Sequence, residues 1–138
     1  MLANLFTPYA GVGELILRLA LGVTFFAHGR GKLKNPAGFA AFLRQIHVPA
    51  PLFNAWLVAL LETAGAVLLI LGIATRILAL GLAVDMGVAL ATVRIGKAPF
   101  ASGPQGGGWE LEFLLLAAAV ALLFTGAGRF ALDSYLGL

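Results

Sequence analysis

The sequence contains no cysteine, and only 11% of its 138 residues are charged. The lack of cysteine excludes disulfides, thiol nucleophiles and iron–sulfur ligation by the chain itself. The scarcity of charge argues against an ordinary soluble domain, in which about 25% of residues are charged. A net charge of +3 without a clustered basic face gives no sign of nucleic-acid binding. Apolar residues are abundant instead, at 61% of the chain against about 45–50% in soluble domains.

Long apolar segments account for this excess and predict an integral membrane protein. About 20 consecutive apolar residues are enough for a helix to cross the hydrocarbon core of a bilayer. Short connections between such segments make neighbouring helices antiparallel. We therefore expect one all-α domain over residues 1–138, an integral membrane four-helix transmembrane bundle. The spans are expected at residues 11–28, 52–73, 77–93 and 109–125.

The segment between the first two spans predicts a short amphipathic helix on the membrane surface. Asn35 suits the N-cap position, and Pro36 suits the first position of a helix. Apolar residues then recur at i, i+3, i+4 and i+7, namely Phe39, Phe42, Leu43 and Ile46. A helix with such a stripe lies in the membrane interface. We expect this interfacial helix at residues 36–47.

The distribution of Lys and Arg predicts the orientation of the chain. The two longer loops carry six basic residues, whereas the opposite side carries only Arg76 and Arg129. Basic loops tend to stay in the cytoplasm, so a multi-pass protein with both termini outside is expected.

A stripe of small residues in the third span predicts close helix packing in lipid. Its members are Ala79, Ala83, Gly87 and Ala91.

Ionisable residues inside the predicted spans are the candidate functional residues. Each costs about 2.5–3.5 kcal/mol on insertion scales, so each needs a partner, a proton or a wet cavity. Glu14, Arg18 and His28 fall on one face of the first helix at 100° per residue. Glu62 lies at the middle of the second span and Asp85 near the middle of the third. We predict that these five residues form one buried polar cluster, with Arg18 as the counter-charge of one carboxylate.

Two interpretations of this cluster stay open. In the first, the cluster is an ion-pair network that fixes the register of the helices and binds nothing. In the second, it lines a pocket for a quinone-like or other small ligand, or relays protons. A haem held by His28 and His47 is disfavoured, because the two lie at a membrane edge and in the connecting helix. No metal site is expected.

Three blocks of sequence, taken in order, resemble the DoxX family of small four-helix membrane proteins. The first runs from Arg18 to Gly22 and continues through Phe25, His28-Gly29 and Lys32-Leu33. The second runs from Pro51 through Ala55-Trp56-Leu57 to Glu62, Leu71-Gly72 and Thr75-Arg76. The third is Gly107-Gly108-Trp109-Glu110-Leu111, followed by Gly126, Gly128-Arg129 and Leu132-Asp133. The shared motif positions, which the resemblance leaves without roles, are Arg18, His28, Lys32, Glu62, Arg76, Trp109 and Glu110.

The resemblance implies a four-helix bundle in a bacterial or archaeal cytoplasmic (inner) membrane, and a tie to redox chemistry. Relatives include a membrane subunit of thiosulfate:quinone oxidoreductase and partners of oxidative-stress enzymes. The resemblance supplies no catalytic mechanism, and function varies across the family. Because this chain has no cysteine, sulfur redox chemistry would need a partner's residues or a bound cofactor.

The expected function is therefore that of an auxiliary or anchoring subunit, which would bind a quinone or a soluble or membrane oxidoreductase. A small transporter or proton-linked carrier is the first alternative, and a purely structural membrane protein is the second. An autonomous enzyme is disfavoured, because the sequence shows no nucleophile, metal cluster or cofactor motif. Apart from a quinone no cofactor is evident, and the lipid bilayer and a homo-oligomeric partner complete the expected contacts.

Overall fold

The computed structural model describes residues 7–104 and 106–137, and the regular elements within these ranges are helices. This confirms the prediction of an all-α protein. Two π-helical turns, η2 and η3, continue the helices that precede them. In chain order the elements are η1 (Thr7–Tyr9), α2 (Ala10–Lys34), α3 (Pro36–Gln45), α4 (Pro51–Leu60), η2 (Leu61–Gly65), α5 (Ala66–Leu71), α6 (Thr75–Ala89), η3 (Leu90–Arg94), α7 (Glu110–Thr125) and α8 (Asp133–Leu136).

Three helical segments of the described chain are long and apolar enough to cross a membrane. They cover Thr7–Lys34, Pro51–Leu71 and Thr75–Arg94. Helix α7 has 16 residues and is therefore about 24 Å long, shorter than the roughly 30 Å of a hydrocarbon core. Its crossing of the membrane stays a prediction. The bounds of the last three predicted spans agree with the helices to within about two residues.

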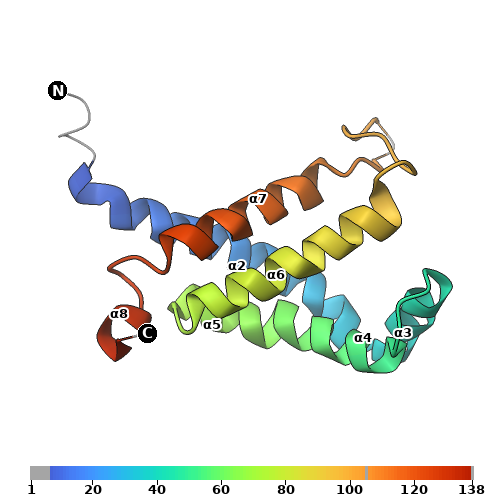
Figure 1. Ribbon diagram of the computed structural model, residues 1–138, viewed down its shortest axis with the longest axis horizontal. Coiled ribbons are helices and arrows are strands. Elements are labelled where there is room, and N and C mark those ends of the chain that lie inside the picture. Colours follow the sequence, from blue (N-terminus) through green and yellow to red (C-terminus); the bar gives the residue numbers. More distant parts are fainter. Residues whose placement is uncertain (1–6, 105, 138) are drawn as a thin grey trace.

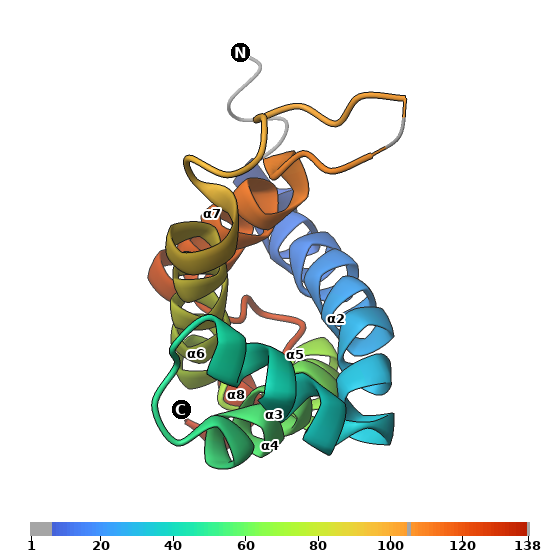
Figure 2. The same cartoon turned by 90° about the vertical axis from the view of Figure 1, so that its right-hand side faces the viewer.

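The helices run back and forth between two ends of the molecule (Figure 1). The start of α2, the α5–α6 turn and α8 lie at one end, which we call the termini end. Helix α3 and the segments 95–104 and 106–109 lie at the opposite end, which we call the loop end. Helix α6 packs along α7, while α2 packs against α4, η2 and α5 and also touches α7. Viewed from the loop end, α3 lies in front of α5 and next to α4 (Figure 2).

The core between these helices consists mostly of alanine and leucine side chains. Large apolar side chains also cover the outside, including Ile77, which is 75% exposed, and Phe124, which is 77% exposed. Such an outer surface suits lipid and would be costly in water. The core consists of Leu21, Phe25, Ala66, Leu69, Ala79, Leu82, Ala83, Met86, Leu115, Ala119 and Leu122.

Helix α2 is longer than predicted, and the reason is a close helix crossing. The sequence analysis ended the first span at His28, because Gly29 and the basic residues after it break the apolar pattern. The helix instead continues to Lys34. A Cβ on Gly29 would lie 2.7 Å from the backbone carbonyl carbon of Glu62, so only glycine lets the two helices approach this closely. This packing offsets the weak helix propensity of glycine.

The small-residue stripe of α6 packs only along its first half. Ala79 and Ala83 are buried against the core. A Cβ on Gly87 would meet no atom within 4 Å, and Ala91 is exposed. The predicted contact through Gly87 is therefore wrong, and the close approach is made by glycines of α2 instead.

Helix α3 begins as the sequence predicts. The Asn35 side chain accepts a hydrogen bond from the Gly38 backbone N–H at 2.9 Å, and Pro36 opens the helix. The buried face of α3 consists of Ala40 and Leu43 packed on Ala55 of α4. Phe42 turns outward and is 39% exposed, although the predicted stripe included it. The location of α3 on the membrane surface stays a prediction.

Candidate functional site

The ionisable residues inside the helices form two groups rather than one. Lys32, Glu62 and Asp85 come together toward the loop end, and we call them the loop-end site. Arg18 and Asp133 come together at the termini end, and we call them the termini-end anchor. The predicted single cluster is thus divided.

An ion pair between α2 and η2 forms the centre of the loop-end site. The Lys32 ammonium lies 2.6 Å from the Glu62 carboxylate, whose side chain is only 1% exposed. The ammonium also sits 5.0 Å from the centroid of the Phe39 ring. Lys32, and not Arg18, is therefore the counter-charge of Glu62. The sequence analysis left Lys32 without a role because it placed this residue outside the first helix.

Asp85 of α6 adds a second carboxyl group to this ion pair. Its charge lies close enough to those of Glu62 and Lys32 to interact with both. Its Oδ2 atom is buried and has no hydrogen-bond partner among the described residues. Glu62 itself stands on the π-helical turn Leu61–Gly65, a distortion that often marks functional positions. Two carboxyl groups and one ammonium therefore meet in the apolar interior.

A cavity of about 140 Å³ opens beside the ion pair. Side chains from four elements surround it, and four ionisable groups lie among otherwise apolar ones. His28 reaches it from α2 while remaining largely exposed, and Glu112 reaches it from α7. The lining consists of Phe25, His28, Lys32, Glu62, Met86, Ala89, Leu111, Glu112 and Leu115.

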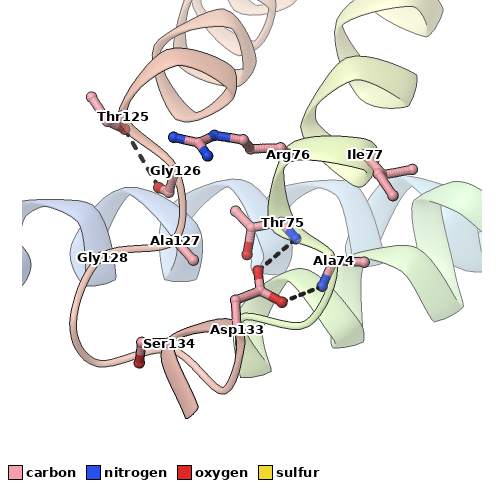
Figure 3. Close-up of a pocket in the computed structure, with 10 residues that line it drawn as sticks. All are labelled: Ala74, Thr75, Arg76, Ile77, Thr125, Gly126, Ala127, Gly128, Asp133 and Ser134. Atoms are coloured by element: carbon pink, nitrogen blue, oxygen red, sulfur yellow. Dashed lines mark hydrogen bonds between the residues drawn. The ribbon is translucent and has the colours of Figure 1, made fainter. Parts of the chain in front are cut away.

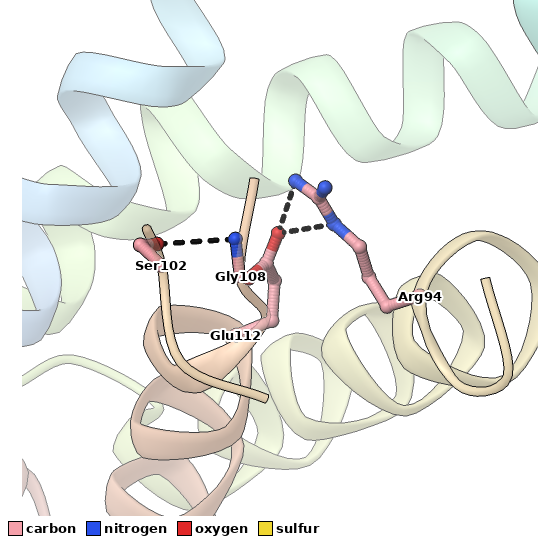
Figure 4. Close-up of polar contacts among 4 residues, drawn as sticks. All are labelled: Arg94, Ser102, Gly108 and Glu112. Carbon is pink, nitrogen blue, oxygen red and sulfur yellow. Dashed lines mark hydrogen bonds and ion pairs between the residues drawn. The ribbon is translucent and has the colours of Figure 1, made fainter. Parts of the chain in front are cut away.

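A second ion pair lies on the α7 side of this cavity (Figure 4). Arg94 of η3 donates from Nε to the Glu112 carboxylate at 2.8 Å, and its Nη2 lies 2.7 Å from the same oxygen. The neighbouring loop is tied down by the Gly108 N–H, which donates to the Ser102 hydroxyl at 3.1 Å. Glu110 accepts a hydrogen bond from the Ser102 N–H at 2.9 Å. Glu110 thus orders the loop, a role that the resemblance left unassigned.

The termini-end anchor is built from hydrogen bonds to the backbone. Arg18 is fully buried and donates to the carbonyl oxygens of Phe130 at 2.9 Å and Ile70 at 3.3 Å. Gly72 leaves room for the guanidinium, since a Cβ there would collide with it. Arg18 therefore fastens the end of α5 and the C-terminal segment to α2.

Asp133 completes the anchor by capping α6 (Figure 3). Its carboxylate accepts hydrogen bonds from the backbone N–H groups of Ala74 at 2.7 Å and Thr75 at 2.8 Å. Burial by itself raises the pKa of Asp133, but the hydrogen bonds from Thr75 and Ala74 outweigh it, with help from Arg18, so the pKa lies below its ordinary value. The sequence analysis missed this role, because the cap comes from a residue 58 positions away.

A larger cavity, of about 320 Å³, lies beside this cap, and two of its charged side chains already bind backbone groups. Arg76 donates from Nε to the Leu123 carbonyl oxygen at 3.3 Å and lies against Gly126. Asp133 is held by the two backbone N–H groups (Figure 3). We take the smaller cavity as the better candidate, because the exposed His28 and the partly exposed Lys32 line it beside a buried ion pair.

The remaining candidates from the sequence lie apart from the loop-end site. Glu14 is half-buried near Gly128 and within the field of Arg18, at the termini end. Trp109 packs edge-on to Phe100 with ring centroids 4.6 Å apart, and so anchors the loop. Within residues 7–104 and 106–137, no three His, Cys, Asp or Glu side chains are grouped to hold a metal.

Comparison with known proteins gives consistent matches. The family model described as DoxX matches residues 3–95. CatD of Bacillus subtilis, a suggested oxidoreductase, is 36% identical over 124 residues, which are 90% of this chain and 87% of CatD. The inner membrane protein YqjF of Escherichia coli is 30% identical over 125 residues, which are 91% of this chain and 92% of YqjF. No solved structure matches the chain significantly.

Proposed function

This chain belongs to the DoxX family of membrane proteins, and we propose that it acts as an auxiliary subunit in membrane redox chemistry whose loop-end site binds a quinone head group. The observation that carries this proposal is the Lys32–Glu62 ion pair on the wall of a cavity among apolar helices. One relative of similar length, CatD, is named as a suggested oxidoreductase, which supports a redox setting.

The chemistry of the cavity suits a quinone ring. Quinone carbonyl oxygens accept hydrogen bonds, and the Lys32 ammonium and the His28 ring supply donors on the same helix. Phe25, Met86 and Leu115 offer apolar and aromatic surface for the ring. A volume of about 140 Å³ suits a head group, while larger pockets of about 300–1,000 Å³ enclose whole drug-sized ligands. The isoprenoid tail would extend between helices into the lipid.

In this proposal α7 forms a fourth membrane crossing, so the loop end lies on the cytoplasmic side and both termini lie outside. Six basic residues lie toward the loop end, against Arg76 and Arg129 toward the termini end, and this difference supports the orientation. The chain shows no redox cofactor motif of its own. The two electrons that reduce a quinone to a quinol would therefore come from a partner oxidoreductase, and two protons would complete the quinol.

Quinone binding tests the proposal directly. We expect the protein purified from its native membrane to contain a quinone by mass spectrometry. We also expect the purified protein in lipid nanodiscs to bind a short-chain ubiquinone or menaquinone in isothermal titration. Lys32→Gln should weaken this binding at least about tenfold, because loss of a charged hydrogen bond costs about 1.5–3 kcal/mol.

A matched control comes from the same helix turn. Lys34 is exposed and does not line the cavity, so Lys34→Gln should bind the quinone as the wild type does. Absence of quinone from the purified protein, together with no binding of either analogue by the wild type, would contradict the proposal. An equal loss of quinone affinity in Lys32→Gln and Lys34→Gln would show that binding depends on surface charge and not on the cavity.

A proton-linked carrier is the second candidate, and one observation favours it. Asp85, Glu62, Lys32 and His28 form a sequence of ionisable groups from the middle of α6 to the edge of α2. Such chains are typical of proton paths in membrane transporters. Substrate-dependent proton flux in proteoliposomes that contain only this protein would favour the carrier, and quinone binding without flux would favour the subunit.

A further inference from the structure

The larger cavity, of about 320 Å³, lies where the start of α6, the end of α7 and the C-terminal segment meet (Figure 3). Its volume falls within the range of about 300–1,000 Å³ in which proteins bind small molecules. Two charged residues line it, Arg76 and Asp133. The kind of ligand that fits this cavity therefore depends on which of these two charges already has a partner.

The negative charge of Asp133 is balanced by groups other than Arg76. Its two carboxylate oxygens accept hydrogen bonds from the N–H groups of Ala74 and Thr75. The buried guanidinium of Arg18 also acts on this carboxylate from inside the protein. Asp133 therefore needs no cation from the cavity.

Arg76 keeps most of its hydrogen-bond donors free. Its Nε donates to the Leu123 carbonyl oxygen at 3.3 Å, whereas its two Nη atoms donate to no residue of the described chain. The side chain extends toward Gly126, where a Cβ would lie 3.1 Å from Nη2 (Figure 3). One hydrogen bond thus holds the guanidinium in place, and its free N–H groups form a fork that matches the oxygens of a phosphate group.

The start of α6 adds backbone donors beside this guanidinium. The first N–H groups of a helix have no partner within the helix. Those of Arg76 and Ile77, which both line the cavity, also have no other acceptor in the described part of the chain. Thr75 is 1% exposed and lines the same cavity, and its Oγ1 makes no hydrogen bond of ordinary geometry with the described residues. Free N–H groups at a helix start favour phosphate, because the helix dipole adds to their hydrogen bonds.

The charges around the cavity also favour an anion. The described side chains at the termini end include three cations, Arg18, Arg76 and Arg129. They include two carboxylates, Glu14 and Asp133, so one positive charge is left over. Because Arg18 lies inside with Asp133, the surplus is available to a ligand at Arg76.

The cavity also borders the apolar outer surface of the protein. Ile77, which lines it, is 75% exposed, and Phe124, the neighbour of the lining residue Thr125, is 77% exposed. This arrangement suits a phospholipid, whose phosphate would enter the cavity while its acyl chains lie along the outer surface. Basic pockets between membrane helices bind lipid head groups in this way.

We propose that the larger cavity binds a phosphate group through the Arg76 guanidinium and the start of α6. The phosphate belongs to a phospholipid head group or to free inorganic phosphate, which present the same anionic oxygens. The site goes beyond the proposed function, because it lies at the termini end and needs no quinone at Lys32.

Titration of the full-length protein in a maltoside detergent and a phosphate-free buffer tests this site. The probes are dihexanoylphosphatidylglycerol, dihexanoylglycerol and inorganic phosphate, each followed by isothermal titration. We expect the wild type to bind dihexanoylphosphatidylglycerol and not dihexanoylglycerol, which has the same acyl chains without the phosphate. Binding of the phospholipid alone would assign the site to a lipid head group, and binding of inorganic phosphate alone would assign it to the free ion.

Variants show whether the cavity holds the phosphate. Arg76→Gln should weaken binding at least about tenfold, because charge-assisted hydrogen bonds to the phosphate are lost. Arg129→Gln is the matched control, since Arg129 is exposed at the same end and does not line the cavity, and its affinity should equal that of the wild type. Lys32→Gln should also bind phosphate normally, which separates this site from the loop-end site. Circular dichroism and gel filtration confirm that each variant is folded.

Three outcomes would overturn the proposal. Equal binding of the two lipids would show that acyl chains bind without any contribution from phosphate. An equal loss of affinity in Arg76→Gln and Arg129→Gln would assign binding to surface charge and not to the cavity. The third outcome is that the wild type binds none of the three probes. If Arg76→Gln does not fold, the comparison of the two lipids with the wild type still decides.

Discussion

At the termini end, Arg18 donates to the backbone carbonyl oxygens of Phe130 and Ile70, whereas at the loop end Lys32 faces a carboxylate and a cavity. Both cations are held inside an apolar bundle, but their partners differ. Backbone oxygens are fixed by the helices and cannot change charge, so Arg18 can only hold segments together. Glu62 and Asp85 can change charge, and the cavity admits a ligand. The comparison indicates that the buried cation holds segments together at the termini end, whereas at the loop end it is placed to interact with a ligand.

The largest expected effect comes from removing the anchor. Arg18→Met should leave two carbonyl oxygens without their donor and Asp133 without a nearby cation, because no other described side chain donates to these oxygens. We expect a loss of about 3–5 kcal/mol, the range for breaking a buried charged interaction. Unfolding in detergent, followed by circular dichroism, measures this loss. An unfolding midpoint equal to that of the wild type would remove the structural role of Arg18.

The next effect concerns the helix crossing that positions Glu62. Gly29→Ala should destabilise the protein by about 1–3 kcal/mol, because the new Cβ would lie 2.7 Å from the Glu62 backbone. Gly31→Ala in the same helix is the control, since a Cβ there meets nothing within 4 Å. Alanine is the better helix former, so the control should gain up to about 1 kcal/mol. If both variants changed stability in the same direction, the close crossing would be contradicted.

A smaller effect is expected at the cap of α6, and it depends on pH. Asp133→Asn should cost about 1 kcal/mol, as loss of a charged helix cap does. The pKa of Asp133 lies below its ordinary value in the folded protein, so its stabilisation is present above about pH 4, the ordinary pKa of Asp. It is lost as the pH falls through the lower, folded-state pKa. Thermal unfolding at a series of pH values should therefore converge for wild type and variant under acidic conditions, and a constant difference would contradict the assignment.

The smallest effect is expected at the second ion pair. Arg94 and Glu112 have side chains that are 34% and 18% exposed, so water screens their attraction. Glu112→Gln should change stability by only about 0.2–1 kcal/mol, as measured for exposed pairs. Because Glu112 lines the cavity, quinone affinity in the same variant shows whether this wall takes part in binding. A stability loss as large as that of Arg18→Met would break the distinction between the two ends.

The sequence predicted the helices well, because apolar runs, Pro36 and the Asn35 cap are local signals. It predicted the length of α2 poorly, since Gly29 ends a helix by local propensity and continues this one by packing on Glu62. It also failed to separate the two polar groups. Helical spacing places Glu14, Arg18 and His28 on one face, but at 1.5 Å per residue Glu14 and His28 lie about 21 Å apart along the axis, so they reach different ends of the bundle.

The partners in the site depend on long-range contacts that the sequence pattern could not provide. Asp133 reaches the start of α6 through the fold of the C-terminal segment, and Arg94 reaches Glu112 across a long loop. Lys32 could have been found, because it lies four residues after His28 and therefore on the same side of a continued helix. Recognition of that continuation would have supplied the counter-charge of Glu62.

The most direct test of the contrast between the two ends measures both properties in the same two variants. Arg18→Lys and Lys32→Gln each alter one buried cation, and each can be followed by unfolding and by titration with a short-chain quinone. The account predicts that Arg18→Lys lowers stability and retains quinone affinity, while Lys32→Gln loses affinity with a much smaller loss of stability. Loss of affinity and of stability in equal proportion in both variants would contradict it.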